Sequence, residues 1–379
     1  MFVWWLIGSW SVLLLITNSA LGKVSRRGPG SWALSAVTVF LLACGLALRG
    51  NMGIDWEGYQ ELYASMPPIS RLLSGGGLLP LNVEPGYQLY MSVFKLLSMH
   101  PNWLPTGLFT LSVAIVLRGC RKWNIPPLPM TAMITMLIYP HFFEQIRMAF
   151  VYMLGISIGI AMLHNDRRSV LSNSMLAASV QYIGIAYIFN VFWRESTVLA
   201  ASTRSHGAGK VVISGRRRVI VIAALLSASA VAYRFSEPLL GAMMQPFALF
   251  INPVSEKLLA YYIRREEVAV SFAGASFLVF SGIALVWLSN RDSIPNRQKV
   301  IFRSGVALLL SVTVWLVIQG FPALSHRIVS MMVKPTLAIL ASHVTLTARR
   351  QGWLYILLSM YSVYSFGKLT DAVGPYSWR

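Results

Sequence analysis

Long apolar runs, separated by short polar segments, recur along the whole of this 379-residue chain. A run of about 18 or more apolar residues is long enough for a helix to cross the hydrocarbon core of a bilayer. Inside that core the backbone must satisfy its own hydrogen bonds, so only helices and closed barrels can span it. Because these runs are longer and more continuous than barrel strands, the sequence predicts an all-α, polytopic integral membrane bundle.

Composition agrees with this fold class. The chain is 56% hydrophobic and 12% charged, with a mean hydropathy of +0.61, which is too apolar for a soluble protein of this length. No Lys or Arg precedes the first run, whereas a cleavable signal peptide begins with a basic segment. We therefore expect this run to stay as a membrane helix. Cys44 lies in an apolar run and Cys120 in a basic loop, so we expect no disulfide and no cysteine-rich metal site.

The formal charge of +19 is concentrated in short loops rather than spread along the chain. Cytoplasmic loops of membrane proteins are enriched in Lys and Arg. We assign to the inside the basic segments at residues 23–27, 118–122, 167–168, 194–218, 291–303 and 349–350. Only three of the 13 acidic residues fall in or directly beside these segments: Asp166, Glu195 and Asp292. The charge is thus explained without nucleic acid, and the acidic chemistry is expected outside.

Alternation between the basic loops sets the order of the membrane segments, with the N-terminus outside. We expect one net crossing within residues 84–118 and helices near residues 3–21, 31–49, 128–140, 147–164, 219–235, 269–289, 301–319, 328–346 and 352–369. The piece at 85–99 should be short, re-entrant or interfacial, because only one net crossing fits there. Residues 169–193 are too few for two crossings and should form two half-spans that meet near residues 181–184.

The expected organisation is one transmembrane domain over residues 1–379. It carries an external loop with an amphipathic helix at 50–84, a cytoplasmic loop at 194–218 and a second external loop at 236–268.

Two carboxylates stand at the starts of expected external helices. Asp55, Tyr59 and Tyr63 are spaced four residues apart, which places them on one helix face. They could be a cap and the aromatic anchors of an interfacial helix, or one wall of a site. Glu84 precedes a Pro-Gly-Tyr sequence that ends at Tyr87, so it could cap a helix or act as a general base in an external cavity.

The segment "YPHFFEQIRMAF" places Arg147 at the head of an apolar run, within one turn of His141, Glu144 and Gln145. Glu144 and Arg147 could form a local ion pair. An arginine at the head of a membrane helix is also suited to an anionic lipid headgroup.

Arg264, Arg265 and Arg327 join Arg147 as cations on the expected outer side, where basic residues are under-represented. Arginine clusters bind phosphate groups bidentately. Snorkelling, anchoring to lipid phosphates and pairing with neighbouring glutamates are the alternatives. The sequence has no metal-ligand spacing, phosphate-binding loop or serine nucleophile motif, so it supports neither a metal site, nucleotide hydrolysis nor serine-type lipolysis.

Together these motifs resemble the EpsG-like family of Wzy-type polymerases, which join O-antigen and exopolysaccharide repeat units. The motifs that carry the resemblance are G-x-D-x-x-x-Y at 53–59, E-P-G-Y at 84–87, Q-I-R at 145–147, and Tyr261, Tyr262 and Arg327. The specific part lies within residues 50–150. The family pattern has a histidine where this chain has Gln181, so no histidine role is carried over.

The resemblance implies a GT-C-like arrangement of about 11–13 transmembrane or re-entrant helices around a periplasmic cavity of the bacterial inner membrane. It implies a growing glycan transferred to the terminal sugar hydroxyl of a new lipid-linked unit, with undecaprenyl diphosphate as leaving group. Expected partners are that lipid-linked glycan, membrane lipids, and chain-length regulator and flippase proteins. No nucleic acid, cofactor or metal is expected.

The resemblance also suggests roles for these residues. Glu84 or Asp55 would be the base. The expected substrate-binding residues are Arg147, Arg264, Arg265, Arg327, Tyr59, Tyr63, Tyr87, Gln145, His141 and Glu144. A flippase or transporter of lipid-linked oligosaccharides, a ligase-like glycan transferase and a non-enzymatic scaffold remain alternatives.

Overall fold

The computed structural model describes residues 2–21, 25–48, 56–73, 83–188, 218–232, 234–235, 272–289, 295–318 and 322–343. In these ranges the regular structure is helical, and they contain no strand. The prediction of an all-α chain is therefore confirmed. The chain forms two compact units, here called unit 1 (residues 1–192 and 337–379) and unit 2 (residues 193–336).

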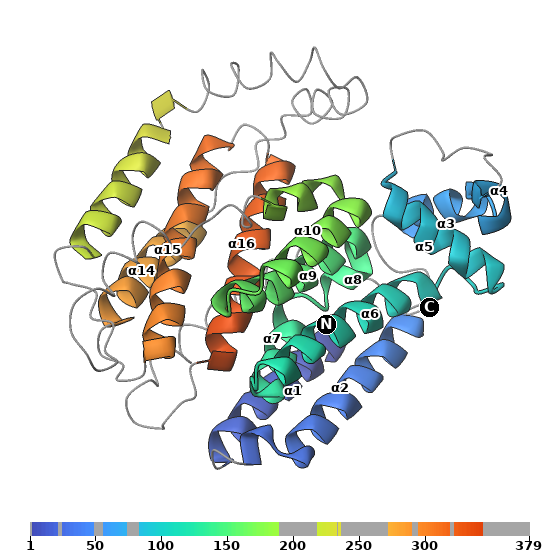
Figure 1. The fold of residues 1–379 in the computed structure, drawn as a ribbon, viewed down its shortest axis with the longest axis horizontal. Coiled ribbons are helices and arrows are strands. Elements are labelled where there is room, and N and C mark those ends of the chain that lie inside the picture. Colours follow the sequence, from blue (N-terminus) through green and yellow to red (C-terminus); the bar gives the residue numbers. More distant parts are fainter. Residues whose placement is uncertain are drawn as a thin grey trace. The chain divides into compact units, whose positions relative to one another are not determined.

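Unit 1 contains most of the elements (Figure 1). They are α1 (Phe2–Ala20), η1 (Ser25–Arg27), α2 (Pro29–Ala47), α3 (Trp56–Ser65), α4 (Ile69–Leu73), α5 (Pro85–Leu96), α6 (Trp103–Lys122), α7 (Pro127–Leu137), α8 (His141–Glu144), α9 (Ile146–Leu163), α10 (Arg167–Val180) and η2 (Tyr182–Ile188). Unit 2 holds a helix at Arg218–Ala232, α14 (Phe272–Leu288) and α15 (Pro295–Val317). The helix α16 (Pro322–His343) begins in unit 2 and ends in unit 1.

Four helices in the described ranges are long and apolar enough to cross a membrane: α2, α6, α9 and the Val300–Val317 part of α15. Helix α5 has only 12 residues, so at a rise of 1.5 Å per residue it is too short to cross a hydrocarbon core of about 30 Å. This agrees with the short segment expected at 85–99. The break expected near residues 181–184 is also present, because α10 ends at Val180 and η2 follows Gln181.

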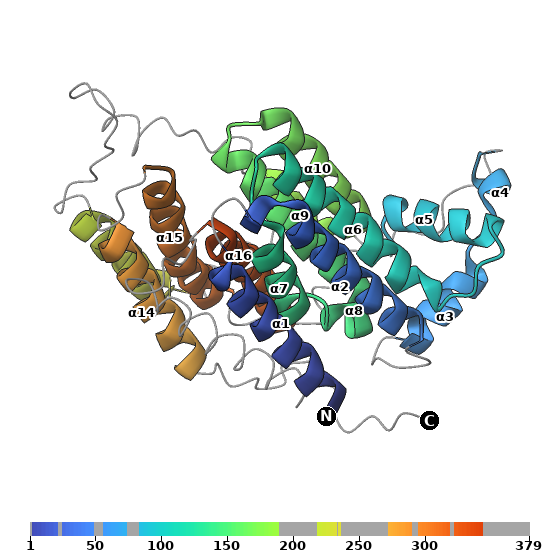
Figure 2. The same cartoon turned by 90° about the horizontal axis from the view of Figure 1, so that it is seen from below.

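The core of unit 1 is formed by α7 and α9, whose apolar residues are buried on every face. A helix that is hydrophobic all round belongs inside a bundle. Helix α9 packs against α6 and α10, and α7 packs against α1 and α2. Helix α2 runs beside α6 in both views (Figures 1 and 2).

Two glycines allow α5 to pack closely against its neighbours. A Cβ on Gly86 would lie 2.5 Å from Ser179 Oγ and 2.8 Å from the Ser179 carbonyl oxygen on α10. A Cβ on Gly107 of α6 would lie 2.3 Å from the hydroxyl of Tyr90 on α5. The Gly86 contact includes backbone, so it depends on the absence of a side chain, and it holds the first turn of α5 beside the end of α10.

Helix α3 is fastened to α5 by side chains that bind backbone carbonyls. Lys95 Nζ donates to two carbonyl oxygens at the C-terminal end of α3, that of Ala64 at 2.7 Å and that of Met66, directly after the helix, at 2.5 Å. The Tyr63 hydroxyl donates to the Met99 carbonyl oxygen at 2.7 Å. Cations and donors at a helix C-terminus satisfy carbonyls that lack an intrahelical partner. Helix α3 lies within residues 50–84, and its aromatic residues Trp56, Tyr59 and Tyr63 are buried.

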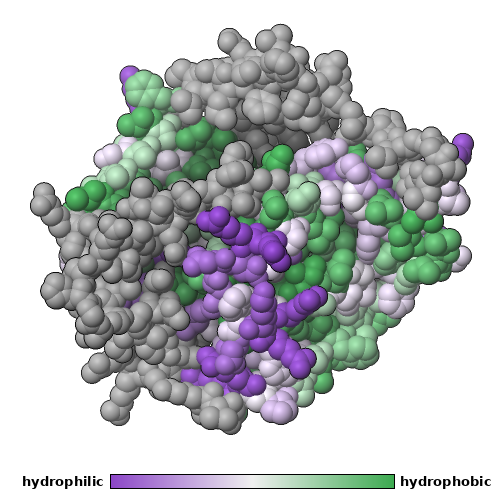
Figure 3. Space-filling view, in the orientation of Figure 1, coloured by the Kyte–Doolittle hydropathy of each residue, from purple (hydrophilic) through white to green (hydrophobic). Residues whose placement is uncertain are grey.

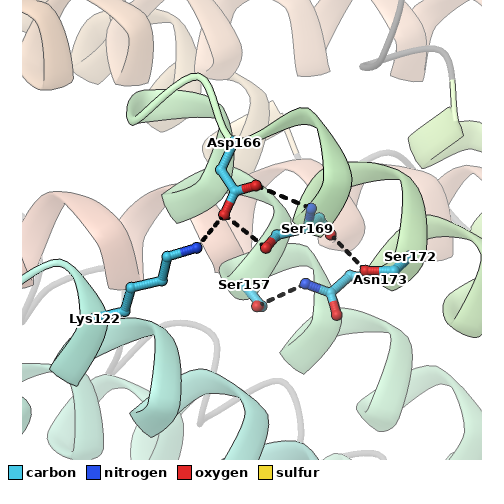
Figure 4. A network of polar contacts seen from close by, with 6 residues as sticks. All are labelled: Lys122, Ser157, Asp166, Ser169, Ser172 and Asn173. Carbon is cyan, nitrogen blue, oxygen red and sulfur yellow. Dashed lines mark hydrogen bonds and ion pairs between the residues drawn. The ribbon is translucent and has the colours of Figure 1, made fainter.

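At the basic ends of α6 and α10, one polar network joins the two helices (Figure 4). Asp166 caps α10 by accepting hydrogen bonds from Ser169 N at 3.2 Å and Ser169 Oγ at 2.7 Å. Its Oδ2 also lies 2.5 Å from Lys122 Nζ at the end of α6.

Hydrophilic side chains gather in one patch on the face displayed in Figure 3, beside hydrophobic surface.

In unit 2, α14 and α15 pack through a pair of glycines. A Cβ on Gly305 would lie 2.8 Å from the Gly282 carbonyl oxygen. Small residues let membrane helices approach closely enough for backbone contact. The expected segment at 352–369, the loop at 236–268 and residues 194–217 of the cytoplasmic loop lie outside the described residues.

Candidate functional site

The most buried pair of opposite charges in the described part of the chain joins α5 to α9. Arg147 Nη1 donates to Glu84 Oε2 in an ion pair between residues 63 apart in sequence. The Glu84 side chain is 4% exposed and that of Arg147 is 19% exposed. Burying two charges carries a large desolvation penalty that their attraction does little more than offset. We therefore take this pair as the candidate functional site.

Glu84 reaches the pair because it precedes α5 without capping it. It occupies the N-cap position with extended backbone angles (φ −66°, ψ 139°), and Pro85 begins the helix. The side chain makes no capping hydrogen bond. The interpretation of Glu84 as a side-chain cap is therefore wrong: its carboxylate binds Arg147 and the Tyr182 N–H instead of an N–H group in the first turn of α5.

Arg147 is placed by two breaks in the chain. Helix α7 ends at Leu137, before Pro140, as the sequence predicted. The four-residue helix α8 then ends at Gln145, where the backbone leaves the helical region (φ −121°, ψ 63°) and α9 begins. Arg147 is thus in the first turn of α9, where the helix dipole disfavours a cation and favours an anion. The Glu84 carboxylate supplies that anion.

Two tyrosines surround the guanidinium. The Tyr87 ring lies with its centroid 5.5 Å from Arg147 Cζ and is fully buried, a distance at which the ring face attracts a cation. Tyr59 of α3 meets Tyr87 edge to face at 6.1 Å, and its hydroxyl is a hydrogen-bond partner of Arg147. Helices α3, α5 and α9 therefore all contribute to one cation site.

The break between α10 and η2 completes the site. The backbone N–H of Tyr182 lies 3.3 Å from Glu84 Oε1 and donates to it. A Cβ on Gly184 would lie 2.5 Å from the Ala177 carbonyl carbon, so the chain turns back tightly onto α10. Both carboxylate oxygens of Glu84 are thereby bound, one by a side chain and one by the backbone.

Three buried polar atoms of this region have no hydrogen-bond partner among the described residues: Arg147 Nε, Gln145 Oε1 and Gln181 Oε1. A buried polar group without a partner costs free energy comparable to a lost hydrogen bond. A bound ligand or water can therefore satisfy these atoms. The free donor on a guanidinium at a helix N-terminus suits an anion, and phosphate oxygens above all.

The structure brings together four of the residues expected at the site: Glu84, Arg147, Tyr59 and Tyr87. Tyr63 is on the same buried face of α3 as Tyr59, and its hydroxyl and ring contact Met99 and Lys95. His141, 2% exposed, meets the ring of Tyr152 edge to face.

The remaining expected residues are not placed at this site. Asp55, Arg264 and Arg265 lie outside the described residues, as does the side chain of Glu144. Arg327 lies in the unit 2 part of α16. Arg147 takes Glu84 as its described ion-pair partner.

Sequence reasoning missed Gln181 and Tyr182 as site residues. The expected break between two half-spans was the available signal, because irregular backbone at membrane depth is tolerated where it lines a cavity or lies inside protein. The break was recognised, but its side chains were not given a role. Among the described residues, no group of three or more His, Cys, Asp and Glu side chains could hold a metal ion.

Comparison with known proteins gives one match. The model of the EpsG family matches residues 32–378, which is nearly the whole chain. Neither the curated proteins nor the solved structures contain a match. The family points to a polysaccharide polymerase of the glycosyltransferase type in a membrane. With its helices, its apolar spans and a family match over this length, the chain belongs to the EpsG family.

Proposed function

We propose that the protein polymerises oligosaccharide repeat units carried on undecaprenyl diphosphate, and that the Glu84–Arg147 pair is where the lipid diphosphate binds. The observation that carries the proposal is the buried guanidinium of Arg147, oriented by Glu84, with Nε left for an anionic ligand. A bidentate arginine fits two oxygens of a phosphate group. Membership of the EpsG family supplies the class of reaction.

The proposed reaction is a glycosyl transfer. The terminal sugar hydroxyl of a new lipid-linked unit loses its proton to a carboxylate, and its oxygen attacks C1 of the sugar that joins the growing glycan to its lipid. The bond between C1 and the diphosphate oxygen breaks, and undecaprenyl diphosphate leaves with the electron pair. Arg147 stabilises the charge that develops on the leaving group.

Glu84 is the described carboxylate beside Arg147, and we propose it as the base, with Asp55 as the alternative. In the structure Glu84 is bound to Arg147. A diphosphate that takes over the guanidinium would release Glu84 Oε2, and a carboxylate without its cation is a better proton acceptor. Tyr59 and Tyr87 then hold the arginine in place, and Arg264, Arg265 and Arg327 are proposed as further phosphate ligands.

The proposed location is the bacterial inner membrane, with the site on the periplasmic side, where lipid-linked units are displayed. Chain-length regulator and flippase proteins are the proposed partners. An undecaprenyl-linked flippase and a ligase-like transferase remain the competing functions, and they predict different glycans.

The test is the ladder of surface glycans made by a strain that lacks the gene. A polymerase predicts single repeat units attached to the final acceptor and no long chains. Loss of all surface glycan would instead indicate a flippase or a ligase, and an unchanged ladder would indicate a scaffold. Complementation with Arg147→Ala should leave the single units, whereas wild-type chain lengths in that strain would overturn the assignment of Arg147.

A further inference from the structure

The break between α10 and η2 reaches the Glu84–Arg147 pair through the Tyr182 backbone N–H, which binds Glu84, and Gln181 directly precedes that residue. Gln181 has extended backbone angles (φ −151°, ψ 120°), and the Tyr182 residue is 40% exposed although its N–H is bound to Glu84. The diphosphate proposal uses neither side chain. Both belong to unit 1, as do Glu84 and Arg147.

The unpartnered atoms of the site differ in hydrogen-bond character. Arg147 Nε is a donor, whereas Gln181 Oε1 and Gln145 Oε1 are acceptors. A diphosphate offers only acceptor oxygens when it is ionised, so it can satisfy the arginine but not the two amide oxygens. A partner for the two amide oxygens must bring O–H or N–H groups. A hydroxyl both donates and accepts hydrogen bonds. It therefore suits each glutamine amide whether the C=O end or the NH2 end of the side chain faces the ligand.

Glu84 adds a further hydrogen-bond acceptor to the site, and Tyr182 adds an aromatic ring. Glu84 Oε1 receives one long hydrogen bond, at 3.3 Å, and a carboxylate oxygen can accept about two. The half-exposed ring of Tyr182 offers an apolar face and a polar tip in one side chain. A pyranose has this same combination, with C–H groups on its faces and hydroxyls at its edge.

We propose that Gln181 and Tyr182 form a sugar subsite, which binds the sugar joined directly to the lipid diphosphate. The inference rests on the proposed function, and it extends that function from the diphosphate to its first sugar. The diphosphate lies on Arg147, the hydroxyls of the sugar bind Gln181 and Tyr182, and C1 stays next to Glu84. The α10–η2 break thereby selects which repeat unit the protein accepts.

The test compares two probes on the purified full-length protein in detergent micelles. One probe is undecaprenyl diphosphate without sugar. The other is the lipid-linked single repeat unit extracted from the strain that lacks the gene. Dissociation constants are measured for the wild type, Gln181→Ala, Tyr182→Ala and Tyr182→Phe, and melting temperatures show which variants are folded. All these substitutions keep the backbone N–H that binds Glu84.

Gln181→Ala and Tyr182→Ala should weaken binding of the sugar-bearing probe about tenfold, because hydroxyls lose buried or half-buried partners. Binding of the bare lipid should stay within about twofold. Tyr182→Phe removes only the hydroxyl and should cost about threefold on the sugar-bearing probe. Ile185→Ala is the matched control, since this exposed residue of η2 is 57% exposed and makes none of the contacts above. It should change neither constant.

Two different failures can be told apart. If the wild type binds both probes and the Gln181 and Tyr182 variants weaken both equally, or neither, the sugar subsite is wrong while the diphosphate site stands. If the wild type binds neither probe, or if Arg147→Ala leaves both constants unchanged, the proposed function itself fails.

Discussion

At the scale of single residues, the ion pair of Glu84 and Arg147 is the feature that most needs explaining. Replacing a buried pair with apolar residues is often neutral or stabilising, so stability alone does not account for it. Arg147 also stands in the first turn of α9, where the helix dipole disfavours a cation. Its Nε has no hydrogen-bond partner among the described residues, and under the proposed function this atom binds the anionic ligand.

The pair should show strong energetic coupling. Glu84→Ala should lower the free energy of unfolding by about 3–5 kcal/mol, because it leaves a buried charge without its partner. The double variant Glu84→Ala with Arg147→Met should lose much less than the sum of the two single changes. Denaturant unfolding in mild detergent gives the free energy of unfolding of the wild type, the two single variants and the double variant. Additive losses would show that the two side chains are not coupled.

The Asp166 network predicts a pH dependence at the opposite, basic end of α9. The hydrogen bond from Lys122, followed by those from Ser169, lowers the pKa of Asp166 to about 2. A lowered pKa means that this carboxylate stabilises the fold above its unfolded value, about 3.9, and that the contribution is lost as the pH falls toward 2. Because Lys122 is 54% exposed, solvent screens the pair, and we expect about 1 kcal/mol.

Asp166→Asn isolates the charge, since asparagine also caps helices well. The wild type should be more stable than this variant at pH 6, and the difference should shrink as the pH falls from 4 to 2. Melting curves at several pH values measure it. A difference that stays constant down to pH 2 would contradict the assignment of the charge to Asp166.

At the scale of elements, α5 determines whether the site can form. It is too short to cross the membrane, and it is wedged between α10 and α6 by close contacts at Gly86 and Gly107. Those contacts bring Glu84 to the end of α10 and, through it, to Tyr182. The positions of Glu84 and Arg147 thus depend on helix packing and not only on their own hydrogen bonds.

Gly86→Ala should therefore impair the site, although Gly86 itself makes none of the contacts to Glu84 or Arg147 described above. The new Cβ would lie 2.8 Å from the Ser179 carbonyl oxygen, which is backbone and cannot rotate away. Relieving the clash moves α5 from α10, and we expect a loss of about 1–3 kcal/mol together with shortened glycans. Gly58→Ala on α3 is the control, because its Cβ meets nothing within 4 Å. Equal glycan ladders from both variants would contradict the proposed packing constraint.

The attachment of α3 can be tested in the same way. Lys95→Met keeps the length of the side chain but removes the donor to the Ala64 and Met66 carbonyls. Hydrogen exchange of the α3 amides should become faster, because the helix loses the contacts at its end. Lys122→Met, far along the chain, should leave α3 exchange unchanged. Equal exchange in wild type and Lys95→Met would show that Lys95 does not hold α3.

At the scale of the whole molecule, the elements could be predicted better than the site. Hydrophobic runs gave the bounds of α1, α2 and α9 to within about two residues, and loop spacing gave the short α5 and the break at Gln181. The partner of Arg147 could not be read from sequence in the same way. Glu144 is three residues away, whereas Glu84 is 63 residues away and is brought in by tertiary packing.

The sequence pattern also could not predict whether a residue at a helix start caps the helix or belongs to the site. Sequence spacing could not tell a capping Glu84 from a site carboxylate, because both precede Pro85. The distinction depends on where the side chain points, which is set by the approach of α5 to α10 and α9. Tyr59 and Tyr63 likewise share one face of α3, yet Tyr59 contacts Arg147 and Tyr63 contacts Met99.

The most direct test of the central claim is polymerisation by the purified protein in liposomes. The substrate is the lipid-linked single repeat unit from the deletion strain, and the products are chain length and released undecaprenyl diphosphate. The wild type should make long chains and release one lipid diphosphate for each bond formed. Arg147→Ala should be slower by about a hundredfold or more, and Arg147→Lys should also be poor because a point charge lacks the bidentate fork. Chains of wild-type length made at the wild-type rate by Arg147→Ala would contradict the account.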